Sequence, residues 1–193
     1  MTRLTPSNPV GLGLIKFAPV DRPFRGRNGR AKYAVIDTRG AGTSLPLREL
    51  IVEHAKARLA ALPACDVIAG VSKSGTVWAA WLSWVCTKPF ANVLPDGPRH
   101  SGLEREVEGD VSGSRVVLVD NWIRSGASIN GAISAVQRAG GAVVGVLVIV
   151  ERRTVAFEVP VIVLWQYKDL LASALDTGLI SPELHAKCLE DES

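Results

Sequence analysis

A run of polar and small residues follows a strongly apolar stretch near the middle of the chain. Residues 116–119 (VVLV) lead directly into Asp120, and small residues (SGAS) occupy positions 125–128. Small residues let backbone N–H groups approach a phosphate, and a helix that begins here adds partial positive charge at its N-terminus. Hydroxyls on Ser125 and Ser128 are further donors. The pattern predicts a phosphate-binding loop, with Asp120 one step before it to accept hydrogen bonds from ribose hydroxyls.

A second segment of the same kind lies earlier in the chain. The apolar residues 66–69 run into Gly70, and Ser72, Lys73, Ser74 and Gly75 follow before another helical stretch. Backbone amides in such a loop can wrap a pyrophosphate, and Lys73 adds a cation. Taken alone, this motif is weak evidence for a pyrophosphate site. A turn exposed to solvent is the alternative interpretation.

The elements around both loops alternate between strand and helix. Apolar strands are expected at 33–37, 66–69, 90–93, 116–119, 143–150 and 161–164, and helices at 47–62, 76–85, 128–139, 169–176 and from 181 or 182 to 189. Residues 1–32 are expected to be irregular, and 94–113 is a long connection of the kind that is usually functional. This alternation predicts an α/β fold, a parallel sheet with helices on both faces. Ligands bind such sheets beyond the carboxyl ends of the strands.

The composition narrows the class of protein. The chain has 193 residues, a net charge of +3 and three cysteines. Cys65, Cys86 and Cys188 are far apart, so reduced core thiols are expected rather than a disulfide framework or a zinc site. We expect a soluble cytoplasmic protein, because there is no signal peptide and no apolar run of about 18 residues. The mild positive charge fits an anionic substrate or a weak nucleic-acid contact.

The segment at Asp120 resembles the diphosphoribosyl-binding pattern of type I phosphoribosyltransferases, and the chain as a whole resembles the orotate phosphoribosyltransferases. The resemblance covers most of the chain and follows the same order of segments. The matching segments are 24–37, 71–75, 88–91, 100–102, 108–110, 116–128, 150–152 and 165–191. It implies a single type I phosphoribosyltransferase-like domain over 1–193, with residues 1–45 forming a small N-terminal hood.

The resemblance also implies roles for individual residues. Asp120 and Asn121 would hold the ribose, with Arg99 and His100 as further catalytic residues. Phosphoribosyl diphosphate would be bound by Ser72, Lys73, Ser74, Gly75, Asp120, Asn121, Arg124, Ser125, Gly126, Ala127 and Ser128, and the base by Arg27, Tyr33, Arg124 and Arg152. The implied reaction transfers ribose 5-phosphate to an orotate-like base and releases pyrophosphate. Mg²⁺ would be bound mainly through the diphosphate, with no direct protein ligand, and the protein would be a homodimer that does not bind membranes.

Three parts of the sequence depart from the family pattern. Asn121 replaces a second acidic residue, and Arg124 replaces a small residue beside the base. In the connection at 93–100, Leu94, Pro95 and Pro98 replace most of the cations that neutralise departing pyrophosphate, which leaves Arg99, His100 and, later in the chain, Arg105 as candidate donors. Two alternatives follow: an enzyme of the same fold with another acidic acceptor, and a non-catalytic sensor or nucleic-acid-binding regulator, with nucleic acid the less favoured partner.

The stretch at 76–85 carries Trp78, Trp81 and Trp84. At this spacing we expect the three indoles to lie in the core rather than on a dimer surface.

Overall fold

The computed structural model describes residues 8–26, 29–98 and 103–190. The chain divides into two compact units, one made of residues 1–50 and 165–193 and the other of residues 51–164. The expectation of one domain with a hood over residues 1–45 stays a prediction.

The second unit is built on a mostly parallel sheet. Its strands are β5 (Val67–Val71), β6 (Phe90–Val93), β7 (Val107–Glu108), β8 (Arg115–Ile123), β9 (Ala142–Glu151) and β10 (Val161–Gln166), and they lie in the order β10-β9-β8-β5-β6-β7. β5 pairs in parallel with β6 and β8, and β8 with β9, whereas β7 is antiparallel to β6. The predicted α/β sheet is thereby confirmed. Parallel pairing also places the ends of β5 and β8 at one edge.

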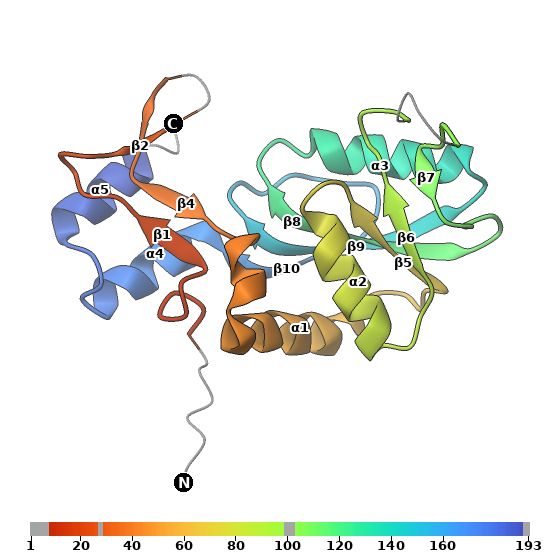
Figure 1. The fold of residues 1–193 in the computed structure, drawn as a ribbon, viewed down its shortest axis with the longest axis horizontal. Coiled ribbons are helices and arrows are strands. Elements are labelled where there is room, and N and C mark those ends of the chain that lie inside the picture. Colours follow the sequence, from red (N-terminus) through yellow and green to blue (C-terminus); the bar gives the residue numbers. More distant parts are fainter. Residues whose placement is uncertain (1–7, 27–28, 99–102, 191–193) are drawn as a thin grey trace, which may run out of the picture. The chain divides into compact units, whose positions relative to one another are not determined.

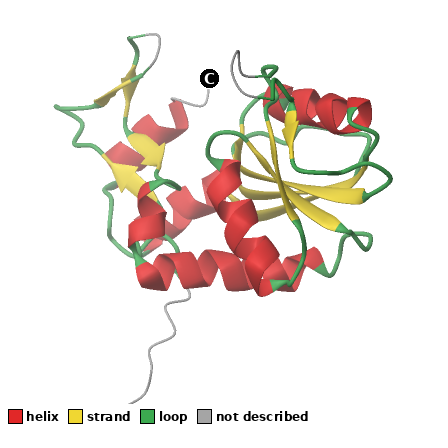
Figure 2. Ribbon diagram, turned by 45° about the vertical axis from the view of Figure 1, so that its right-hand side comes forward, coloured by secondary structure: helices red, strands yellow, loops and turns green. Residues whose placement is uncertain are grey.

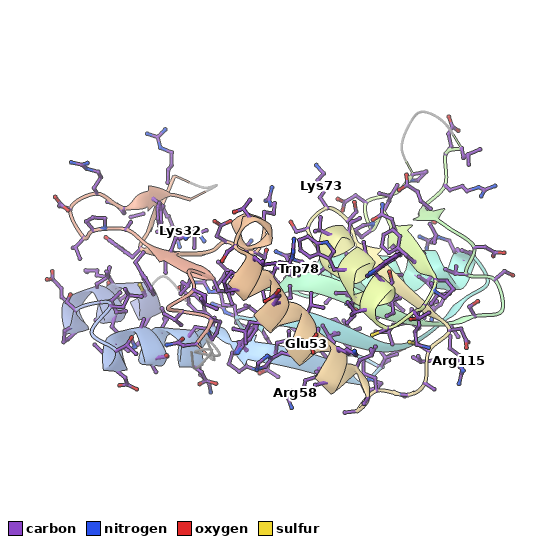
Figure 3. All side chains as sticks on the ribbon, turned by 60° about the horizontal axis from the view of Figure 1, so that its bottom comes forward. Lys32, Glu53, Arg58, Lys73, Trp78 and Arg115 are labelled. Carbon is purple, nitrogen blue, oxygen red and sulfur yellow. The ribbon has the colours of Figure 1, made fainter. Side chains whose placement is uncertain are left out.

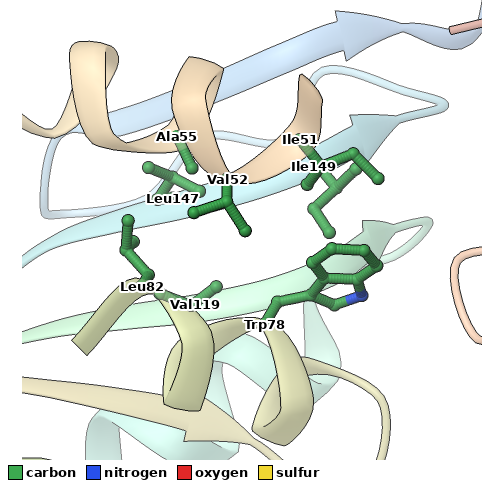
Figure 4. Close-up of a pocket in the computed structure, with 8 residues that line it drawn as sticks. All are labelled: Ile51, Val52, Ala55, Trp78, Leu82, Val119, Leu147 and Ile149. Atoms are coloured by element: carbon green, nitrogen blue, oxygen red, sulfur yellow. The ribbon is translucent and has the colours of Figure 1, made fainter. Parts of the chain in front are cut away.

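Helices cover both faces of this sheet because its strands are apolar on both sides. Val116 and Leu118 of β8 share a core with α3 (Ala127–Arg138), which lies on one face (Figure 1). On the other face Val119 lines a small gap together with residues of α1 (Leu45–Leu59) and α2 (Gly75–Val85). Figure 4 shows this second core, which is formed by Ile51, Val52, Ala55, Trp78, Leu82, Val119, Leu147 and Ile149. The gap between them measures about 10 Å³, room for one water-sized sphere, so it is a packing gap and not a ligand site.

The first unit combines short strands and two helices (Figure 2). β1 (Ile15–Phe17) pairs with β4 (Ala34–Ile36), and β2 (Phe24–Arg25) with β3 (Ala31–Lys32), both antiparallel. A 3₁₀ turn, η1 (Gly40–Thr43), precedes α1. The helices α4 (Tyr167–Asp176) and α5 (Pro182–Glu190) follow β10. The predicted start of α5 is confirmed, because Ser181 Oγ accepts a 3.2 Å hydrogen bond from Leu184 N, as a helix-capping serine does.

Two expectations about the elements are wrong. Residues 1–32 are not irregular throughout, since they contain β1, β2 and β3; strands of two or three residues are too short to show an alternating pattern. The strand predicted at 116–119 does not end before Asp120. It continues to Ile123, because β9 pairs with it as far as Ile123 and Glu151.

The tryptophan prediction is correct for one residue and wrong for another. Trp78 is buried and makes an edge-to-face contact with Trp81, with ring centroids 5.0 Å apart. Trp84 is 84 % exposed. Each step of three residues falls about 60° short of a full helical turn, so Trp84 has rotated away from the sheet.

The three cysteines are free thiols, and Cys65 and Cys188 are buried, as expected. Burial raises the pKa of the Cys65 thiol. Within the described ranges, no helix combines the length and apolar character that crossing a membrane would require.

Candidate active site

Asp120 is a buried carboxylate inside a strand. Its residue is 6 % exposed, and its Oδ1 accepts a 2.7 Å hydrogen bond from the backbone N–H of Asn121. Removal from water penalises the charged form and raises the pKa of Asp120 to about 7, although the Asn121 hydrogen bond acts in the opposite direction. Asp120 therefore titrates near neutral pH, and its backbone is fixed by the strands on both sides.

The N-terminus of α2 lies directly beside Asp120. A Cβ atom on Gly75 would collide with the carbonyl oxygen of Val119 and would come within 3.1 Å of the Asp120 Cα. Only glycine lets the helix start so close to the strand. The first turn of α2, with its unpaired backbone N–H groups, is thus held next to the buried carboxylate.

The loop before α2 is attached to β6 at both ends. The N–H of Ser72 donates to the carbonyl of Val93 at 2.8 Å, and the hydroxyl of Thr76 donates to Asn92 Oδ1 at 2.6 Å. Between these anchors Lys73 is exposed, and its side chain extends away from the ribbon (Figure 3). The peptide bond between Ser72 and Lys73 is cis. The loop presents backbone amides, a cation and a helix N-terminus on one side, which suits a polyanion.

A second helix N-terminus follows β8. α3 begins at Ala127, one residue before the expected start, and Gly126 is its N-cap residue, with a φ of +78°. A side chain at Gly126 would meet Val155 and Phe157 at 2.9 to 3.0 Å, so glycine is required here for both conformation and space. Ser125, Ala127 and Ser128 are exposed around this turn. The loop is therefore shorter than the sequence suggested, consisting of residues 124–126 only.

Two arginines continue the ends of neighbouring strands. Arg124 follows β8 and is exposed, whereas Arg152 follows β9 and is half-buried, with its Nε atom inside the protein. The backbone N–H of Arg152 donates to the carbonyl of Ile123 at 3.1 Å, so the two arginine backbones leave the sheet side by side. Asn121 and Trp122 are half-buried residues of β8 between Asp120 and this pair.

Four predicted site residues lie either outside the described residues or in the first unit. Arg27, Arg99 and His100 lie outside the described residues. Tyr33 is half-buried in the first unit, where its carbonyl accepts a 2.9 Å hydrogen bond from Ala18 N. Their roles at a base or at departing pyrophosphate stay predictions.

The long connection between β6 and β7 is anchored where the structure describes it. Pro95 lies against α3, because a Cβ on Gly131 would come within 2.8 Å of the Pro95 carbonyl oxygen. On the other flank Glu106 accepts two hydrogen bonds from the Arg138 guanidinium, at 2.7 and 2.8 Å. The described residues on both sides of this connection therefore contact α3, the helix whose N-terminus follows β8.

Three residues of the site were missed from the sequence: Thr76, Asn92 and Glu108. Asn92 is 6 % exposed in β6 and donates from Nδ2 to Glu108 Oε2 at 2.7 Å. One signal was available, since Asn92 is the only polar residue in the strand sequence FANV, and buried amides require partners. Among residues 8–26, 29–98 and 103–190, no cluster of three or more His, Cys, Asp or Glu side chains could hold a metal ion.

Comparison with known proteins identifies the family of the chain. Residues 63–163 match the model of the phosphoribosyl transferase domain. The orotate phosphoribosyltransferase of Pyrobaculum islandicum is 35 % identical over 142 residues, which cover 73 % of this chain and 70 % of the relative. That of Streptococcus pneumoniae is 28 % identical over 84 % of this chain and 81 % of its own length. The crystal structure of orotate phosphoribosyltransferase from Aeropyrum pernix superposes with a TM-score of 0.66 at 25 % identity, over 84 % of this chain and 94 % of that one. The chain therefore belongs to the type I phosphoribosyltransferase family.

Proposed function

We propose that the protein transfers ribose 5-phosphate from phosphoribosyl diphosphate to an orotate-like pyrimidine base and releases pyrophosphate. The observation that carries this proposal is the position of Asp120. It lies in β8 against the N-terminus of α2, and the same strand leads to the N-terminus of α3. Two anion-binding helix ends and a carboxylate between them match the diphosphate, the ribose and the 5-phosphate of the donor. The relatives at 35 % and 28 % identity are both named orotate phosphoribosyltransferase, which supports orotate as the acceptor base.

In this proposal the donor is bound by three parts of the chain. The ionised carboxylate of Asp120, with Asn121, accepts hydrogen bonds from the ribose hydroxyls. Ser125, Gly126, Ala127 and Ser128 bind the 5-phosphate, and Ser72, Lys73, Ser74 and Gly75 bind the diphosphate. Arg124 and Arg152 bind the acidic base, and the sequence resemblance adds Arg27 and Tyr33 as further predicted base-binding residues.

Charge separation is the chemical demand of this reaction. The bond between the anomeric carbon and the diphosphate oxygen breaks while a base nitrogen, which gives up its proton, forms the new bond to that carbon, and positive charge develops on the ribose. Donors and cations placed at the departing oxygens stabilise that state. Lys73 and the α2 N-terminus are such groups, and Arg99 and His100 are the further ones proposed in the long connection, where Leu94 and Pro95 supply none.

A magnesium ion carried by the diphosphate fits these residues. Mg²⁺ commonly binds through one or two carboxylates and substrate phosphates rather than through a dedicated protein cage. When bound, the ion would neutralise diphosphate charge, and the protein would orient the complex through its amides.

The test is a direct assay with a binding control. Protein, phosphoribosyl diphosphate, Mg²⁺ and orotate are mixed, and the loss of orotate absorbance is followed while titration calorimetry measures donor binding. Turnover is the expected result. Donor binding without turnover on orotate would remove the orotate assignment and favour a second acceptor.

That second acceptor is the alternative that Arg124 favours. An exposed arginine beside the half-buried Arg152 doubles the cationic donors where a base would lie, which suits an acceptor with more negative charge than orotate. A screen of carboxylated and phosphorylated bases, read by mass spectrometry of the nucleotide product, separates the two cases.

We also propose that the protein is a homodimer. Val77, Trp81 and Trp84 lie at i, i+4 and i+7 along α2 and thus share one face of the helix. Val77 is 48 % exposed and Trp84 84 % exposed. A large indole left in water on a helix that begins at the site is best accounted for by a second copy of the chain.

A further inference from the structure

A hydrogen-bonded chain of three side chains connects α2 to the far edge strand of the sheet. Thr76 Oγ1 donates to Asn92 Oδ1 at 2.6 Å, and Asn92 Nδ2 donates to Glu108 Oε2 at 2.7 Å. The three residues come from α2, β6 and β7, and β6 pairs Asn92 directly with Glu108. Asn92 is almost fully buried, so its amide has a fixed environment.

The direction of this chain is set by Glu108. An ionised carboxylate can only accept hydrogen bonds, so the amide nitrogen of Asn92 must face it. The amide oxygen then faces Thr76, and the Thr76 hydroxyl must donate inward. As a result, the Thr76 hydroxyl has one orientation in this chain, with its hydrogen directed at Asn92.

The chain acts on a loop that β6 holds at both ends. Val93 fixes the start of the loop through its carbonyl, and Asn92, the residue before it, fixes the first turn of α2 through its side chain. On the opposite side Gly75 lies against Val119 and Asp120. The first turn of α2 is therefore held between Asn92 and the backbone of Val119 and Asp120.

We propose that Asn92, oriented by Glu108, is a positioning residue that holds the first turn of α2 in place for the diphosphate of the donor. This inference rests on the proposed function for its ligand. The hydrogen bonds that join Thr76, Asn92 and Glu108 do not depend on that function, because they form in the protein without a ligand. Asn92 touches no reacting atom and works through Thr76.

The sharpest test is a charge exchange across the pair. Asn92→Asp places two carboxylates in contact and breaks the chain. The double variant Asn92→Asp with Glu108→Gln restores it, because the amide introduced at position 108 then donates to one oxygen of the carboxylate introduced at position 92, while Thr76 still donates to the other. Thr76→Val removes the hydroxyl at nearly constant shape. Ser83→Ala is the matched control, since Ser83 is a buried hydroxyl on the same helix that bonds to the Ala80 carbonyl in its own turn.

Two readouts decide the outcome. Calorimetric dissociation constants for phosphoribosyl diphosphate, measured far below the melting temperature, should rise roughly tenfold in Asn92→Asp and in Thr76→Val, as expected for one lost hydrogen bond. They should return to within about twofold of wild type in the double variant. Amide exchange of the free protein should speed up over residues 71–77 in the same two single variants and not in Ser83→Ala.

Variants that melt earlier but keep wild-type donor affinity and exchange at 71–77 would overturn the proposal and leave Asn92 a packing residue. If wild type binds no donor, the proposed function fails, and the exchange data alone then decide the inference: faster exchange that the double variant reverses supports it, and unchanged exchange overturns it.

Discussion

Gly75 lies against the backbone of Asp120 so closely that no other residue type fits between the first turn of α2 and β8. This close contact places the backbone N–H groups at the start of α2 beside the buried carboxylate of Asp120, although Gly75 and Asp120 are far apart in the sequence. The proposed donor site depends on this contact, because neither loop alone provides groups for both a sugar and a diphosphate.

Gly75→Ala is therefore expected to damage both stability and donor binding. The added methyl must push α2 away from Val119 and Asp120, and such overpacking costs about 1–3 kcal/mol. Urea denaturation and donor titration measure the two effects. Gly11→Ala is the control, because a Cβ atom added to Gly11 would meet one atom within 4 Å, at 3.8 Å, and Gly11 has no positive φ. This substitution should change the free energy of unfolding by less than about 0.5 kcal/mol. Wild-type behaviour in Gly75→Ala would contradict the close approach.

Asp120→Asn should increase stability at high pH while it removes function. The folded-state pKa of Asp120 is about 7, above its ordinary value of 3.8, so the folded protein holds this proton more tightly than the unfolded chain. The contribution of Asp120 to the free energy of unfolding then falls as pH rises from about 4 to 7. At pH 8 the variant should be more stable than wild type by a few kcal/mol, since each pKa unit is worth about 1.4 kcal/mol.

Denaturation at pH 5 and pH 8 measures this difference, which should be larger at pH 8. Donor affinity of wild type should rise across the same range, because the ionised carboxylate accepts the ribose hydroxyl hydrogens. The exposed Asp21→Asn is the control and should follow wild type at both pH values. A stability difference that is equal at pH 5 and pH 8 would show that Asp120 does not titrate there.

Arg124→Ala is expected to separate acceptor recognition from donor recognition. If Arg124 binds an anionic group of the base, its loss should raise the acceptor KM by about tenfold to a hundredfold, the range for one hydrogen bond to a charged group. The donor dissociation constant should stay within about twofold. Steady-state kinetics and calorimetry measure the two, with the exposed Arg153→Ala as control. An unchanged acceptor KM would show that Arg124 is only a surface residue.

Trp84→Ser should dissociate the proposed homodimer. The substitution removes a large apolar side chain from the exposed α2 face and should shift sedimentation from dimer to monomer at micromolar concentration. Leu179→Ser removes another exposed apolar residue, 54 % exposed, from the other unit and should leave the dimer intact. A monomeric wild type, or a dimeric Trp84→Ser, would exclude this face as the interface.

Much of the second unit was predictable because its strands are continuous apolar runs separated by helices. Residues 90–93 were predicted with correct bounds, and α2, α3 and β9 within one or two residues. The small residues at 125–128 and 72–75 indicated two helix N-termini. What the sequence could not provide was the end of β8. Asp120, Asn121 and Trp122 look like the start of a loop, yet pairing with β9 extends the strand through them.

Tertiary contacts that join distant residues were also out of reach. The sequence spacing of Thr76, Asn92 and Glu108 does not connect them. They meet because β6 pairs Asn92 with Glu108 of β7, and Asn92 also accepts a hydrogen bond from Thr76 of α2. The need for glycine at position 75 arises from Val119 and Asp120, which no local pattern around residue 75 reveals. Trp84 was misplaced for a simpler reason, because successive steps of three residues were treated as one helix face.

In the proposed site, β8 carries the donor-binding and acceptor-facing residues on one ladder, with Asp120 paired inside the sheet and Arg124 just beyond its last paired residue. The two halves of the reaction are therefore separable in evolution. Substitutions at 122–124 can retune the choice of base while the sheet keeps the carboxylate in register. A protein built in this way can acquire a new acceptor by drift at the tip of a single strand, and its donor chemistry is inherited unchanged.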